Sequence, residues 1–315
     1  MDILSIILNI LTSGLPCVLL ALGIFLTYRV LDFADLTAEG SFLIGASLTA
    51  MLIYFKINPF IATFAGLLGG VICGLITGFL NRILKIPKLL SGIITMTASA
   101  SLAMLIMGFT KPDQLFYLQI PLSVEKGGDI QTIYSIFYPW NEYNRVVEVA
   151  VMVVFVVAII VGLYYFFGTE YGMAIRSTGM NEKMAHSQGI NTTAATIVCI
   201  AISNGLIGLG GALYVQDVLS VSTISATGYL VIGLASILIG EAIFGKRSFK
   251  NWLISVSLGS IVYFVIITVA TELGFPTQLK NLLYAILITI ALCLPAIKNG
   301  IASLFKKKDA TSKEV

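Results

Sequence analysis

The feature that most constrains this chain is a series of long apolar stretches separated by polar connections. About 20 consecutive apolar residues are needed for a helix to cross a bilayer, and backbone polar groups in lipid must bond within a helix or a closed barrel. The stretches predict an all-α, polytopic transmembrane protein with about nine to ten membrane helices. We place nine of them at residues 3–28, 41–55, 59–80, 89–110, 147–167, 192–214, 228–244, 251–271 and 279–297.

Composition supports this fold class, because the chain has too few charged residues to cover a soluble surface. Of its 315 residues, 57% are hydrophobic and 11% are charged, whereas soluble domains carry about 25% charged residues. We expect one transmembrane domain over residues 1–305 and a polar cytoplasmic tail over residues 306–315. Gly14 and Pro16 predict a kink or break in the first stretch.

Lysine and arginine are distributed unevenly between the two sides of the membrane. Alternating the stretches across the bilayer places five of the 19 on one side, namely Lys56, Lys111, Lys126, Arg145 and Lys280. Positive charge marks the cytoplasmic side, so we expect the N-terminus outside and the C-terminus in the cytoplasm. The fourteen on the cytoplasmic side are Arg29, Arg82, Lys85, Lys88, Arg176, Lys183, Lys246, Arg247, Lys250, Lys298, Lys306, Lys307, Lys308 and Lys313.

Two segments of the chain resemble each other. The sequence LTAEGSFLIGASLTAML at residues 36–52 is similar to ISATGYLVIGLASILIG at residues 224–240. In the alternating assignment, the helix after the first copy runs outward and the helix after the second runs inward. This predicts inverted repeat halves, an architecture in which solute carriers place their site at the repeat interface. Chance similarity between segments rich in Leu, Ile and Gly is the alternative.

Two long connections stand out. Residues 111–146 form an external loop rich in aromatic residues, which either meets a soluble protein or lies at the membrane interface. Residues 168–191, GTEYGMAIRSTGMNEKMAHSQGIN, lie on the cytoplasmic side and combine glycine breaks with a short amphipathic stretch. A short helix on the membrane surface gives a soluble motor protein a place to push. An ordinary surface loop is the alternative.

The segment 168–191 resembles the cytoplasmic coupling loop of permeases in the branched-chain amino acid and monosaccharide family of ABC importers. The family pattern is roughly G-x-x-x-R-A-x-G-x-N followed by A-x-x-x-G-I, and Ser177 stands where alanine is usual. The segment LALGIFLTYRVLDFADLTAEGSFLIGA at residues 20–46 is similar to the family's first conserved block, and is closest to its tryptophan/tyrosine branch. The resemblance assigns ATPase coupling to Gly172, Arg176, Gly179, Asn181, Glu182, Ala185 and Gly189.

The resemblance implies a permease subunit that forms the pathway for a small solute, an amino acid such as tryptophan or tyrosine. Two permease copies would enclose the pathway, and two cytosolic ATPase subunits would bind ATP and dock on the coupling helices. An extracytoplasmic binding lipoprotein would deliver the solute. The chain would lie in the lipid of a bacterial plasma membrane, without a cofactor, nucleic acid or covalent chemistry of its own.

Polar residues inside apolar stretches are candidates for the pathway. Ser91, Thr95 and Ser99 recur every four residues and form a polar stripe on one helix. Asn204 lies in the middle of a later stretch. These side chains either face a pathway or, as is common in membrane helices, bond to their own backbone or to a neighbouring helix.

Acidic residues lie between the first two stretches. Glu39, with Asp32 and Asp35, belongs to the polar connection 29–41. Ionisable groups at membrane depth are costly and usually functional, so these residues would be pathway groups if the connection enters the membrane. If it lies in the cytoplasm, they are solvated loop charges.

Other function classes have less support. An ion-coupled secondary transporter is the main alternative, but Glu241 and Asp217 lie near helix ends. An enzyme would need a clustered set of reactive groups, whereas the chain has one histidine and four cysteines in apolar stretches without metal-ligand spacing. The sequence GEAIFGKR at residues 240–247 fits G-x-x-x-x-G-K, but Arg247 stands where Ser or Thr would bind magnesium.

Overall fold

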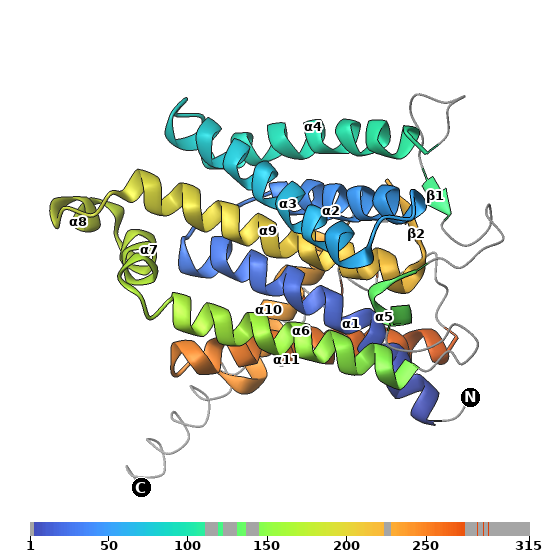
Figure 1. The fold of residues 1–315 in the computed structure, drawn as a ribbon. Helices are drawn as coiled ribbons and strands as arrows, with labels where there is room; N and C mark the ends of the chain where they lie inside the picture. Colours follow the sequence, from blue (N-terminus) through green and yellow to red (C-terminus); the bar gives the residue numbers. More distant parts are fainter. Residues whose placement is uncertain are drawn as a thin grey trace, which may run out of the picture.

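The computed structural model describes residues 3–110, 119–121, 131–136, 145–223 and 228–274, together with residues 282, 286 and 289. Two short strands, β1 (Gln119–Pro121) and β2 (Ser220–Ser222), pair antiparallel, and the other described elements are helical (Figure 1). The helices are α1 (Ile3–Phe25), η1 (Leu26–Val30), α2 (Thr37–Tyr54), α3 (Pro59–Arg82), α4 (Lys88–Gly108), α5 (Ile133–Ile136), α6 (Arg145–Phe166), α7 (Glu170–Met180), α8 (Glu182–Ser187), α9 (Thr192–Val218), α10 (Tyr229–Phe244) and α11 (Phe249–Glu272).

The all-α, polytopic fold class is confirmed. Within the described residues, seven helices are long and apolar enough to cross a membrane. The seventh predicted stretch, residues 228–244, corresponds to α10, which is apolar but has only 16 residues. The ninth stretch, residues 279–297, lies almost wholly outside the described residues, as does the tail 306–315.

Two details of the first helices differ from the sequence prediction. α1 is one helix through Pro16, so the break, one of the two predicted alternatives, is absent, since neighbouring helices can satisfy the backbone groups that a helix breaker frees in a membrane protein. Its irregularity follows later, in the π-helical turn η1. α2 begins at Thr37, before the predicted start at residue 41, because polar side chains in its first turns bond inside the protein: Thr37 shares a hydrogen bond with Thr77.

α9 forms the centre of the bundle, and small residues let its neighbours approach closely. α9 contacts α1, α2 and α3 along its length and is mostly buried. A Cβ on Gly70 of α3 would overlap the carbonyl oxygen of Asn204, and a Cβ on Gly45 of α2 would overlap Gly208. The glycines of α3 therefore pack within one chain. α4 and α6, in contrast, expose apolar faces that suit lipid.

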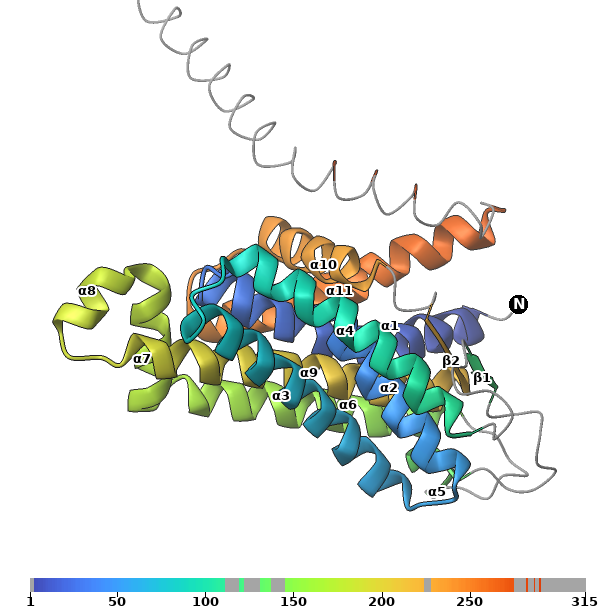
Figure 2. The same cartoon turned by 90° about the horizontal axis from the view of Figure 1, so that it is seen from above.

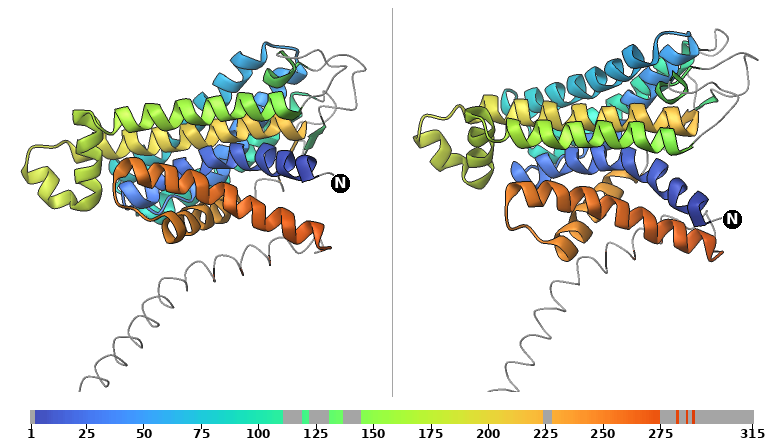
Figure 3. Two further views of the ribbon diagram at one scale, coloured as in Figure 1. Left: turned by 90° about the horizontal axis from the view of Figure 1, so that it is seen from below. Right: turned by 60° about the horizontal axis from the view of Figure 1, so that its bottom comes forward.

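The long helices run along the same general direction, so the molecule has two ends (Figure 3). α7 and α8 lie at one end, while the N-terminus, β1, β2 and α5 lie at the other (Figures 1 and 2). We call these the α7–α8 end and the β1–β2 end.

α2 and α10 both begin in the interior and run toward opposite ends. Their starts are joined by a hydrogen bond of 2.9 Å, in which the backbone N–H of Gly228 donates to Glu39 Oε1. α10 ends beside α11 near α7, where Asn251 donates to the carbonyl of Phe244. α2 leads to the turn before α3 at the β1–β2 end. This opposed pair is the arrangement that the inverted repeat predicts.

Candidate functional site: the α7–α8 segment and the buried polar cluster

The α7–α8 segment, residues 168–191, is built from two short helices whose ends are fixed by local side chains. Thr169 accepts a hydrogen bond from the N–H of Gly172 and so caps α7. Asn181 ends α7 and caps α8, accepting a 3.1 Å hydrogen bond from the N–H of Met184. After α8, Gly189 adopts φ +83°, a conformation that only glycine adopts readily. These two caps and the conformation of Gly189 therefore fix where α7 and α8 begin and end.

Close backbone contacts anchor α7 to the membrane helices. A Cβ on Gly172 would overlap the backbone of Phe166 and Phe167 at the end of α6. A Cβ on Gly179 would overlap the carbonyl oxygen of Val30 in η1. α7 can lie this close to both helices only because these two positions are glycine.

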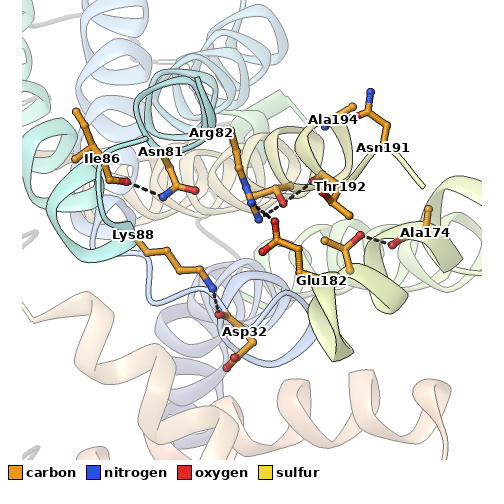
Figure 4. Close-up of polar contacts among 12 residues, drawn as sticks. Asp32, Asn81, Arg82, Ile86, Lys88, Ala174, Glu182, Asn191, Thr192 and Ala194 are labelled. Carbon is orange, nitrogen blue, oxygen red and sulfur yellow. Dashed lines mark hydrogen bonds and ion pairs between the residues drawn. The ribbon is translucent and has the colours of Figure 1, made fainter. Parts of the chain in front are cut away.

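Charged side chains add further connections between this segment and the bundle. Arg82, at the end of α3, forms an ion pair with Glu182 of α8 and donates a 2.7 Å hydrogen bond to Thr196 of α9 (Figure 4). Arg176 of α7 lies over the ring of Phe249 at the start of α11, 4.9 Å from its centroid. Arg82 therefore links α8 to two membrane helices, and Arg176 links α7 to a third.

Large apolar side chains are exposed on the outer surface of the segment, among charged and polar residues that include Glu182 and Lys183. Met180 is 88% exposed and Tyr171 is 79% exposed, and Met173 and Met184 are also exposed. Ala185 faces inward and is buried. A groove of about 380 Å³ runs between α7 and the first turns of α9. Clusters of exposed apolar side chains are typical of surfaces that contact another protein or a membrane.

A second group of polar residues is buried at the meeting point of α2, α9 and the connection between η1 and α2. Asn204 Nδ2 donates to Asp35 Oδ2 at 2.7 Å, and Ser41 donates to Asn204 Oδ1 at 2.7 Å. Asp35 Oδ1 accepts from the N–H of Thr37 at 2.8 Å. Burial raises the pKa of the Asp35 carboxyl, and hydrogen bonds from Thr37 and Asn204 act in the opposite direction. Asn204 was a candidate from the sequence, but its pairing with Asp35 was not predicted.

The polar stripe of α4 packs against neighbouring helices. Ser91 and Thr95 are buried and donate to carbonyls of their own helix. Ser99 is buried beside Cys73 of α3, with 3.5 Å between oxygen and sulfur. Glu39, in the first turn of α2, instead accepts a hydrogen bond from Gly228 at the start of α10. The structure thus brings Ser41, Asp35 and Asn204 together, and Cys73 of α3 lies between Ser41 and Ser99 of the stripe.

Within the described residues, no group of three or more His, Cys, Asp or Glu side chains could hold a metal ion. The GEAIFGKR sequence begins in the last turns of α10, so it follows a helix, whereas a phosphate-binding loop follows a strand.

These features define a class of protein, a multi-spanning helical membrane protein with two short helices that project at one end. A family model described as the permease component of the branched-chain amino acid transport system matches residues 6–292. The chain belongs to this family of ABC transporter permeases for small solutes. No solved structure matches the chain significantly.

Relatives in the family carry different substrate names. The chain is 34% identical over 285 residues to a tyrosine transport system permease protein of Clostridioides difficile, covering 90% of each chain. It is 27% identical to a nucleoside ABC transporter permease of Lactococcus lactis, covering 75% of each. It is 24% identical to a galactofuranose transporter permease of Escherichia coli, covering 90% of this chain and 78% of that protein.

Proposed function

We propose that this chain is the permease subunit of an ATP-driven importer and that the α7–α8 segment is where a cytosolic ATPase docks. The observation that carries the proposal is a projecting segment with exposed Met and Tyr side chains, which contacts four membrane helices and η1 through Gly172, Gly179, Arg82 and Arg176. An ATPase that binds α7 and α8 and changes conformation moves these two helices, and with them the membrane helices that they contact. Gly189, Asn181 and Ala185 keep the surface folded.

The proposal includes the partners and the orientation. Two copies of the chain form the pathway, two ATPase subunits bind ATP and dock at the α7–α8 end, and a binding lipoprotein delivers solute at the β1–β2 end. This chain itself binds no nucleotide. The α7–α8 end faces the cytoplasm, because Arg29, Arg82, Lys88, Arg176 and Lys183 gather there. The N-terminus then lies outside.

The docking proposal is tested by assembly. The tagged chain is co-expressed with its cognate ATPase, purified in detergent and in lipid nanodiscs, and its subunit stoichiometry is measured. We expect two permeases with two ATPases, and loss of the ATPase on Met180→Asp. The matched control is Leu273→Asp, since Leu273 is 83% exposed but lies after α11, at the other end.

The alternative function is an ion-coupled secondary transporter, for which the buried Asp35 would be a coupling group. A chain that purifies without any ATPase in every detergent and in nanodiscs would favour that alternative and contradict the docking proposal.

An amino acid is the proposed substrate, with tyrosine and tryptophan the first to test. Support comes from the tyrosine transport permease, the only one of the three relatives named above that exceeds 30% identity. Fluorescence titration of the cognate binding protein against tyrosine, tryptophan, branched-chain amino acids, nucleosides and sugars checks this. We expect binding of an aromatic amino acid, and binding of sugars or nucleosides alone would contradict it.

A further inference from the structure

Residues Leu31–Leu36, which we call the connector, join η1 to α2. Helices from elsewhere in the chain contact the connector at both of its ends. At its start, α7 lies against Val30 and Leu31 through Gly179. At its end, α4 lies against Leu36, because a Cβ on Gly92 would be 2.8 Å from the nitrogen of Leu36. Between these points Lys88 of α4 donates a 2.9 Å hydrogen bond to the carbonyl of Asp32 (Figure 4).

One side chain of the connector holds it to the centre of the bundle. Asp35 is 6% exposed and Asn204 is 0% exposed, and each uses its polar atoms on the other or on a close neighbour. Asn204 Nδ2 donates to Asp35 and also to the carbonyl of Ile200 at 3.0 Å, while its oxygen accepts from Ser41 of α2. Breaking such a bond leaves buried polar atoms unpaired, which is costly.

The connector is not packed on every side. A cavity of about 80 Å³ separates it from α10, and Tyr28, Ala34, Asp35, Leu36 and Leu230 are among its lining residues. The cavity is partly open to the surface, and its volume is enough for about two to three waters. The connector therefore has room to shift toward α10 while its two ends stay in contact with α7 and α4.

We propose that the connector transmits movement of the α7–α8 segment to the interior start of α2, and that Asp35 and Asn204 are positioning residues for this step. α7 contacts Leu31 at the start of the connector, and α2 begins directly after its end, at Thr37. A displacement of α7 can therefore reach α2 through the connector. Because Asp35 is hydrogen-bonded to Asn204 of α9, the connector moves relative to α9, which stays in place. This inference rests on the proposed function and extends it to residues far from the docking surface.

Movement of the connector can be measured without changing its polar contacts. Ala34 is exposed, so Ala34→Cys carries a thiol on the connector, in a background with Cys293 replaced by Ser; the other three cysteines are buried. Maleimide labelling of the assembled complex is timed with and without nucleotide trapped in the ATPase. We expect the labelling rate to change on trapping, with an unchanged rate at Lys56→Cys at the other end. An equal rate at Ala34→Cys in both states overturns the proposal.

The positioning role is tested by an exchange of side chains. Asn204→Asp places two carboxyl groups together, and adding Asp35→Asn restores one donor and one acceptor. In proteoliposomes, solute transported per ATP hydrolysed should fall about tenfold in Asn204→Asp and recover in the double variant. Ser203→Ala is the control, because Ser203 is equally buried but donates to Gly23 of α1.

The outcomes separate this inference from the proposed function. An unchanged ratio in Asn204→Asp, or an equal fall in Ser203→Ala, overturns the positioning role while the complex still transports. Where Asn204→Asp does not assemble, the Ala34→Cys labelling decides. Absence of an ATPase from the wild-type preparation is a failure of the proposed function itself.

Discussion

At the scale of single residues, Gly179 shows how one missing side chain fixes a long-range contact. The backbone of Val30 occupies the place where a Cβ of residue 179 would lie. We predict that Gly179→Ala destabilises the protein by about 1–3 kcal/mol, the usual cost of overpacking, measured as thermal unfolding in detergent.

Gly162 is the matched control for this change. It is an exposed residue within α6, and a Cβ there would meet nothing within 4 Å. Gly162→Ala should be neutral or stabilising, since alanine is favoured over glycine in a helix by about 1 kcal/mol. Equal destabilisation by both changes would mean that the contact with Val30 does not hold α7 in place.

The sequence could indicate these glycines but not their contacts. The family pattern marks Gly172 and Gly179, yet nothing local shows that Gly179 meets Val30, far away in the chain. Asp35 and Asn204 pose the same difficulty. Each is visible as a polar residue in or beside an apolar stretch, whereas the hydrogen bond between them spans 169 residues and depends on how the helices pack.

At the scale of elements, α8 depends on its cap because it has only six residues. Asn181→Ala removes the acceptor for the N–H of Met184. Losing such a cap costs about 1 kcal/mol, so amide hydrogen exchange over residues 182–187 should quicken about fivefold. Asn181→Asp keeps an acceptor and should exchange at the wild-type rate. Equal exchange in Asn181→Ala and wild type would show that α8 is held by Glu182 and Ala185 instead.

Apolar stretches located most membrane helices but misplaced the interior start of α2. Hydropathy indicates where a helix is apolar, and therefore missed the first turn of α2, which contains Thr37, Glu39 and Gly40. These polar groups bond within the protein: Thr37 bonds to Thr77, and Glu39 to Gly228. A helix that begins inside the bundle shows this pattern, and composition alone does not distinguish it from a solvent loop.

At the scale of the whole molecule, the two ends should face opposite sides of the membrane. Lys56 and Lys183 are both exposed, one after α2 and the other in α8. We predict that a membrane-impermeant maleimide labels Lys56→Cys in intact cells, and labels Lys183→Cys only after the cells are opened. The reverse pattern would contradict the orientation inferred from Lys and Arg.

The short α10 has a consequence for how the chain is made. With 16 residues, α10 is about 24 Å long, less than the roughly 30 Å of a bilayer's hydrocarbon core. Its backbone touches that of α11 where Gly240 meets Ser255 and Gly259 meets Ser236. During synthesis, α10 leaves the ribosome before α11 exists to cover it, so we expect the two helices to enter the lipid together as a hairpin. A chain that stops between them should hold α10 in the membrane less firmly.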